Sequence, residues 1–223
     1  MPGLYKKEDF RDNCGFGLVA NINGVKSNQV IINSINALIS MTHRGGVGSD
    51  GKTGDGCGLL FDIDKKYFND VISQEQNIDL GERFAIGQLF FSGDVLTILP
   101  KINKVLKSEN LQLITHRNVP VNRDILGKIA LDCIPNIYQL FIESIKEPSN
   151  QDSFETSLIQ ARKFIEEIFM DDEKLYFCSM SSKTIVYKGL MLPNAIKEFY
   201  IDLNQDNFRA STCVFHQRFS TNT

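Results

Sequence analysis

The sequence lacks the features that mark a membrane, secreted or zinc-binding protein. No stretch approaches the roughly 20 apolar residues that a membrane helix needs. The first ten residues contain no apolar run of the kind found in a secretory signal. The five cysteines are an odd number and include no C-x-x-C pair, so neither a zinc site nor a disulfide framework is expected. We therefore predict a cytoplasmic protein with reduced thiols, no metal site and no membrane contact.

An excess of basic residues is also missing. Lys and Arg total 24 against 27 Asp and Glu, which gives a formal net charge of -3 at pH 7. A nucleic-acid partner is not expected, because surfaces that bind nucleic acids are usually basic. What the chain does have is length and apolar content. Its 223 residues, 42% of them hydrophobic, suffice for one large domain with a sizeable core.

Hydrophobic periodicity predicts that strands alternate with helices. Asp152 followed by Glu155 predicts a capping box for the longest helix. No element is assigned to residues 125–143, because Pro135 breaks any single helix through them. The alternation indicates an α+β or an α/β fold, and the pattern does not separate the two. Strands are expected at 15–23, 57–63, 83–92, 110–115, 175–180, 183–188 and 212–216, and helices at 27–41, 64–76, 95–108 and 153–170.

Residues 43–58 are unusually rich in glycine, with seven glycines in sixteen positions. Regular structure is not expected there, because glycine costs backbone entropy inside a helix or strand. A loop of this length in a compact domain is usually functional or disordered. Its backbone N–H groups could bind an anion, but the Lys-Ser/Thr ending of a P-loop is absent.

Cys14 precedes the first predicted strand, and two interpretations are open. A free cysteine has a pKa of about 8.5 and needs a base to become nucleophilic. Cleavage between Asn13 and Cys14 would supply one, because the new α-amine has a pKa of roughly 7.7–8.0 and can accept the thiol proton. The alternative is a buried structural cysteine. We expect that second role for Cys133, Cys178 and Cys213, which lie in apolar, strand-like contexts.

Two arginines are candidate ligands for a carboxylate. Arg218 follows the last predicted strand among hydroxyl-bearing residues, and a guanidinium in that position suits bidentate capture of a carboxylate. Arg44 can bind a carboxylate or satisfy the carbonyls at the end of the preceding helix, and the helix-end role is favoured for His43. Asp62 and Asp64 are interpreted as solvent-facing carboxylates.

Three segments occur in an order and spacing that resemble one known family. They are residues 11–17 (RDNCGFG), residues 43–46 (HRGG) with 50–58 (DGKTGDGCG), and residues 215–223 (FHQRFSTNT). Together they resemble the class II glutamine amidotransferase domain of glutamate synthases, and the resemblance runs from about residue 4 to the last residue. It implies the N-terminal-nucleophile hydrolase fold, a four-layer αββα arrangement in which two antiparallel sheets lie between helical layers.

The resemblance also implies a site. Residues 1–13 would be a leader, and residues 14–223 the N-terminal part of the amidotransferase domain. Cleavage after Asn13 would expose Cys14, whose thiolate attacks the side-chain amide of L-glutamine, releases ammonia and leaves a thioester for hydrolysis. Arg218 would hold the substrate α-carboxylate, Thr221 would line the pocket, and His43 and Arg44 would border it.

In the full family the ammonia passes to 2-oxoglutarate in an oxidoreductase that serves ammonia assimilation and glutamate biosynthesis. Its FMN and iron–sulfur cluster belong to later domains, so we expect no cofactor in this chain. The family's oxyanion-hole Asn-Gly pair and an acidic residue for the substrate amine are expected beyond Thr223, which makes the fold incomplete at its C-terminus. The remaining glutamate synthase domains, or a second chain, would complete it. The alternatives are a catalytically inactive fragment and one half of a split amidotransferase.

Overall fold

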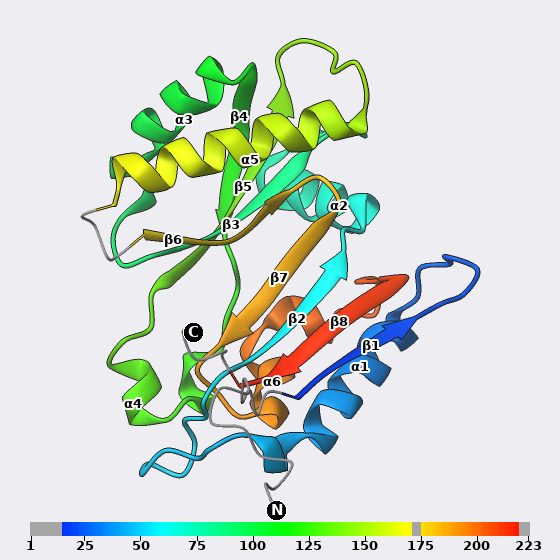
Figure 1. Ribbon diagram of the computed structural model, residues 1–223, viewed down its shortest axis with the longest axis vertical. Coiled ribbons are helices and arrows are strands. Elements are labelled where there is room, and N and C mark those ends of the chain that lie inside the picture. Colours follow the sequence, from blue (N-terminus) through cyan, green and yellow to red (C-terminus); the bar gives the residue numbers. More distant parts are fainter. Residues whose placement is uncertain (1–14, 171–174, 219–223) are drawn as a thin grey trace, which may run out of the picture.

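The computed structural model describes residues 15–170 and 175–218, which form two four-stranded antiparallel sheets with helices packed on them (Figure 1). Every strand pairing within the sheets is antiparallel, so the α+β alternative is confirmed and the α/β alternative is wrong. The strands are β1 (Gly15–Ala20), β2 (Cys57–Asp62), β3 (Ala85–Phe91), β4 (Leu111–Asn118), β5 (Asn136–Ser144), β6 (Leu175–Ser181), β7 (Thr184–Gly189) and β8 (Thr212–Gln217). The helices are α1 (Asn28–Ser40), α2 (Lys65–Gln76), α3 (Leu99–Ser108), α4 (Lys128–Leu131), α5 (Gln151–Ile168) and α6 (Ile196–Phe199), with short 3-10 turns η1 (Thr42–Arg44), η2 (Val95–Thr97), η3 (Arg123–Ile125), η4 (Pro193–Ala195) and η5 (Ile201–Asn204).

The first sheet has the strand order β1-β8-β2-β7, and α1 packs against β1 and β8 (Figure 1). Ile31, Ile35 and Leu38 of α1 are buried, as their helical spacing predicts. They join a core that includes Phe61 of β2 and Phe215 of β8. Burial of this apolar stripe fixes α1 on one face of the sheet, and so fixes where the chain emerges after Ser40.

The second sheet has the order β4-β5-β3-β6, and α3 and α5 lie over it (Figure 1). Leu158 and Ile165 of α5 pack with Leu89, Leu140 and Phe177 from the sheet in a separate apolar core. Strand β5 overlaps the range 125–143 that the sequence left unassigned and extends one residue beyond it, and it begins directly after Pro135. Strand β4 continues to Asn118, further than its apolar residues alone predicted.

A buried polar network contacts elements of both sheets. Arg117 of β4 pairs with Asp202 of η5 at 2.6 Å, and each side chain is 3% exposed. The hydroxyls of Tyr67 and Tyr187 donate to the same carboxylate at 3.1 and 2.9 Å, and Arg117 Nε donates to Gln139 at 2.7 Å. Burial and the nearby Asp202 raise the pKa of Tyr187 well above its ordinary value, so its hydroxyl stays a donor. Loss of one member of such a pair typically costs about 3–5 kcal/mol, because the other charge stays buried.

The capping box of α5 differs from the one that the sequence predicted. The side chain of Asn150 accepts a hydrogen bond from Ser153 N at 2.8 Å, and Ser153 Oγ accepts one from Asn150 N at 3.3 Å. The predicted pair Asp152–Glu155 is therefore wrong by two residues. Asn150 has the extended backbone that an N-cap requires, whereas Asp152 already lies in the first helical turn.

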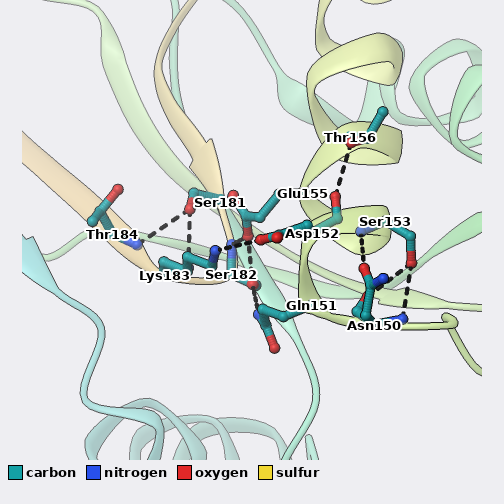
Figure 2. Close-up of polar contacts among 10 residues, drawn as sticks. All are labelled: Asn150, Gln151, Asp152, Ser153, Glu155, Thr156, Ser181, Ser182, Lys183 and Thr184. Carbon is teal, nitrogen blue, oxygen red and sulfur yellow. Dashed lines mark hydrogen bonds and ion pairs between the residues drawn. The ribbon is translucent and has the colours of Figure 1, made fainter.

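Glu155 instead anchors the turn between β6 and β7 (Figure 2). Its carboxylate accepts hydrogen bonds from Ser182 N at 2.7 Å and from Ser181 Oγ at 2.9 Å, and Ser182 Oγ donates to it as well. The β6–β7 connection joins the second sheet to the first, since β6 pairs with β3 and β7 pairs with β2. Glu155 thus ties α5 to the place where the chain crosses between the sheets.

Two further expectations from the sequence are wrong. Asp62 is partly buried rather than solvent-facing, since its side chain is 25% exposed and accepts hydrogen bonds from Ser211 N and Thr212 N at 2.8 and 2.7 Å, where β8 begins. Asp64 is 4% exposed and pairs with Arg209 at 3.1 Å. Cys133 is exposed at the end of α4 rather than in the core, whereas Cys213 is buried as expected.

In the described part of the chain, no helix has both the length and the apolar character that crossing a membrane requires.

We expect Glu155→Ala to lower the free energy of unfolding by about 1–3 kcal/mol, because buried donors of the β6–β7 turn lose their acceptor. Asp152→Asn is the matched control, since Asp152 lies in the same helical turn but is 89% exposed, and its carboxylate pairs with Lys183 at 3.1 Å rather than with the β6–β7 turn backbone. Urea unfolding followed by circular dichroism measures both. Equal effects of the two changes would contradict the anchoring role of Glu155.

Candidate functional site

The candidate site begins where α1 ends. Met41 terminates the helix, and η1 carries His43 and Arg44. His43 is exposed, and its Nδ1 donates to the Ser40 carbonyl at 3.1 Å, which is the helix-end contact expected for it. Arg44 lies beside Gly15, because its Cδ is 3.5 Å from the point where a β-carbon on Gly15 would stand. The turn after α1 therefore reaches the start of β1.

The glycine-rich segment forms an ordered hairpin-like loop. Val47 and Gly54 form an isolated antiparallel bridge, and Gly48 N donates to Thr53 O at 2.7 Å. Within the turn, the Asp50 carboxylate accepts hydrogen bonds from Thr53 Oγ1, Thr53 N and Ile129 N at 2.6, 2.8 and 3.0 Å. These bonds, the one from Thr53 Oγ1 above all, hold the pKa of Asp50 well below its usual range. The backbone is irregular, as predicted, but its conformation is specified by side-chain hydrogen bonds.

The end of β8 lies between β1 and β2. Gln217 is the partner of Gly15 on β1 and of Cys57 on β2. At the next residue the backbone turns, because Arg218 has a φ of 76° while its N–H donates to Gly56 O at 2.7 Å. This left-handed conformation costs a residue with a β-carbon roughly 1–3 kcal/mol, and such strain is typical of functional positions.

Asp55 links the glycine-rich loop to the end of β8, and it was not among the site residues predicted from the sequence. Its Oδ2 accepts a hydrogen bond from Gly46 N at 2.8 Å and lies 3.8 Å from Arg218 Nε. The carboxylate thus contacts both the loop that follows Arg44 and the residue that follows β8. Asp55 lies within residues 50–58, one of the segments that carry the family resemblance, but an acidic residue between two glycines by itself indicates no more than a turn.

Gln217 is buried without a partner for its side chain. Its exposure is 0%, and neither the amide nitrogen nor the amide oxygen bonds to any residue within 15–170 or 175–218. The amide packs on Gly45, where an added β-carbon would lie 2.1 Å from Nε2. With Gln217 in this side-chain conformation, only glycine at position 45 leaves room for the contact. An unsatisfied buried amide is rare in native proteins and calls for an explanation in terms of solvent, ligand or function.

Three of the site residues inferred from the resemblance can be located, and three positions cannot. His43, Arg44 and Arg218 lie in the described chain, at the end of the first sheet where β1 begins and β8 ends. Asn13, Cys14 and Thr221 lie outside the described residues. Arg44 lies beside Gly15, the first described residue after Cys14. Arg218 is the last described residue before the segment that contains Thr221.

The described cysteines are poor nucleophiles in three of four cases. Burial raises the pKa of the Cys57, Cys178 and Cys213 thiols to about 12, so they stay protonated at neutral pH. Cys133 is the exposed one. Nowhere in the described ranges do three or more His, Cys, Asp or Glu side chains gather in a group able to hold a metal ion.

We expect Gly45→Ala to destabilise the protein by about 1–3 kcal/mol, because the new methyl group displaces a buried side chain. The double variant Gly45→Ala/Gln217→Ala should recover most of this loss, since the collision partner is gone. Thermal unfolding of the wild type, both single variants and the double variant measures the effect. Purely additive losses would show that Gly45 is needed for another reason.

Comparison with known proteins gives one consistent result. A family model described as "Glutamine amidotransferases class-II" matches residues 14–223. The chain is 37% identical to a ferredoxin-dependent glutamate synthase 1 of Arabidopsis thaliana, with 100% of this chain and 14% of that protein aligned. It is 37% identical to a glutamate synthase [NADPH] large chain of Bacillus subtilis over 99% of this chain and 15% of that protein, and 35% identical to a glutamate synthase [NADH] of Saccharomyces cerevisiae over 99% and 11%.

Proposed function

Because the chain belongs to the class-II glutamine amidotransferases, we propose that it hydrolyses L-glutamine to glutamate and ammonia with Cys14 as the nucleophile, as the glutaminase part of a glutamate synthase. One observation carries the proposal. The family match begins at Cys14, which precedes Gly15 in the sequence, and Gly15 lies beside Arg44 and pairs with Gln217, the residue before Arg218. Residues 1–13 are, on this proposal, a leader that is removed.

The chemistry follows from a free α-amine at Cys14. The amine takes the thiol proton, and the thiolate attacks the side-chain carbonyl carbon of glutamine. The resulting ammonium group returns a proton to the leaving nitrogen, which departs as ammonia and leaves a γ-glutamyl thioester on the sulfur. Water then attacks the thioester with the amine as base, which releases glutamate and restores the thiol.

Arg218 is proposed to hold the α-carboxylate of the substrate. Its side chain is 33% exposed, so a ligand can reach it, and the residue follows directly on the end of β8. A guanidinium offers parallel N–H donors that match both carboxylate oxygens. Thr221 is proposed to line the same pocket, and His43 and Arg44 to border it, with Arg44 nearer the chain start because it lies against Gly15.

The chain spans only 14 to 15% of the first two relatives above, so a whole glutamate synthase reaction is a further proposal. In it the ammonia passes to 2-oxoglutarate, and FMN and the iron–sulfur cluster belong to other domains. A feature of the first sheet supports contact with more polypeptide. Phe16 and Leu18 of β1 are 78% and 63% exposed, and Val214, opposite Leu18 on β8, is 40% exposed. We propose that the remaining glutamate synthase domains, or a second chain, cover this face.

Arg218→Ala should raise the KM for glutamine about 10- to 100-fold, which corresponds to a charge-assisted hydrogen bond of roughly 1.5–3 kcal/mol. The rate at which Cys14 reacts with iodoacetamide, a small neutral alkylator, should stay unchanged. Steady-state glutaminase assays and peptide mass spectrometry measure the two quantities in the protein that carries this chain.

Arg162→Ala serves as the control, since Arg162 bonds to Glu166 and the Phe177 carbonyl, on α5 and β6. It should leave both quantities unchanged. If Arg218→Ala reduces alkylation as strongly as it raises KM, the variant is misfolded or the site is elsewhere. If it changes neither, Arg218 does not bind substrate.

A further inference from the structure

The contacts of Asp55 link two segments that are far apart in the sequence, the start of the glycine-rich loop and the end of β8. One oxygen, Oδ2, both accepts the hydrogen bond from Gly46 N at 2.8 Å and faces Arg218 Nε at 3.8 Å. The Asp55 N–H in turn donates to Gly46 O at 3.4 Å. Gly46 is thus hydrogen-bonded to Asp55 through both its N–H and its carbonyl. The Asp55 carboxylate that accepts from Gly46 N is also the ion-pair partner of Arg218.

The ion pair leaves part of the guanidinium available. At 3.8 Å the Nε–Oδ2 contact is electrostatic rather than a hydrogen bond. Among residues 15–170 and 175–218, the Arg218 guanidinium has no hydrogen-bond partner, and its one ion pair is with Asp55, nearest through Nε. The carboxylate therefore lies at the Nε edge, and the Nη1/Nη2 edge remains able to receive a bidentate anionic ligand.

Stability alone does not explain this arrangement. The side chains of Arg218 and Asp55 are 33% and 45% exposed, and ion pairs at such exposure contribute little to folding because water screens them. The left-handed backbone at Arg218 costs free energy rather than providing it. A weak pair that holds a strained arginine is better explained by orientation of the side chain than by stabilisation of the fold.

We propose that Asp55 is a positioning residue of the glutamine site: it holds Arg218 by the Nε edge and couples it to the loop that follows His43 and Arg44. The inference rests on the proposed function, because it assigns Arg218 to the α-carboxylate of glutamine. The negative charge of Asp55 also repels a carboxylate from the Nε edge, so the substrate is directed to the Nη1/Nη2 edge. Asp55 itself does not touch the substrate.

Asp55→Asn is the informative change, because asparagine keeps an oxygen acceptor for Gly46 N and removes the charge that faces Arg218. Two effects oppose each other. Loss of the charge relieves repulsion of the substrate, but it also frees the guanidinium from its orientation. Misplacement of a binding group commonly weakens substrate binding more than removal of a screened surface charge strengthens it. We therefore expect the KM for glutamine to rise about 3- to 10-fold with kcat nearly unchanged.

The matched control is Asp50→Asn, a carboxylate of the same loop that bonds to Thr53 and Ile129 and makes no contact with Arg218. It should leave KM unchanged even if it lowers the melting temperature. In the Arg218→Ala background, Asp55→Asn should have no further effect on KM, because there is no guanidinium left to orient. A glutamine analogue whose α-carboxylate is replaced by an amide should not distinguish Asp55→Asn from the wild type.

The outcomes separate this inference from the function on which it rests. If Arg218→Ala raises KM but Asp55→Asn leaves it unchanged or lowers it, Asp55 does not position Arg218 and the inference fails. If Asp55→Asn and Asp50→Asn raise KM equally, the effect comes from the loop as a whole and the inference also fails. If Arg218→Ala leaves KM unchanged, the proposed function fails before Asp55 is considered.

Discussion

The pairing of β8 with β1 on one side and β2 on the other is the constraint on which the candidate site depends. A single register places Gly15, Gln217 and Cys57 in one row across three strands. That row brings the start of β1, the end of β8 and the exit from the glycine-rich loop to the same edge. A slip of one residue would move every side chain of β8 to the opposite face, so burial of Phe215 and Cys213 specifies the register strongly.

Side-chain hydrogen bonds from carboxylates hold the irregular segments around that row. Asp62 accepts from the two backbone amides at which β8 begins, and Asp50 closes the turn of the glycine-rich loop. Asp55 bonds to Gly46 where that loop starts. Each carboxylate satisfies backbone N–H groups in a loop or, for Thr212, at the first residue of a strand. The glycines allow the loop many backbone conformations, and the hydrogen bonds to Asp50 and Asp55 restrict them.

Much of this architecture follows from the sequence, for identifiable reasons. The spacing of Ile31, Ile35 and Leu38 predicted α1 correctly, because one apolar stripe faces one core. The alternation of strands and helices did not decide between antiparallel and parallel sheets, since strand direction depends on which strands become neighbours. The capping box was misplaced because Asp152 and Glu155 also have the residue types and spacing of a capping box. Only the extended backbone at Asn150 shows which residue is the N-cap.

The candidate site was predictable in its motifs and not in its contacts. Arg218 and Arg44 were recognised from the segments that resemble amidotransferases, whereas Asp55 was not, because its partners lie nine residues before it and 163 residues after it. The buried amide of Gln217 was equally hidden, since a polar residue that ends an apolar strand usually faces solvent. Both depend on tertiary neighbours, which no local pattern reports.

Covalent labelling by a glutamine analogue tests the central claim, that Cys14 becomes a chain start whose own amine activates its sulfur. The protein that carries this chain is treated with 6-diazo-5-oxo-L-norleucine, with and without excess glutamine, and is mapped by mass spectrometry. The account predicts that residues 1–13 are absent, that the adduct is on Cys14, and that glutamine prevents it. A chain that still begins at Met1 with Cys14 unmodified, or an adduct on the exposed Cys133 that glutamine does not prevent, would contradict it.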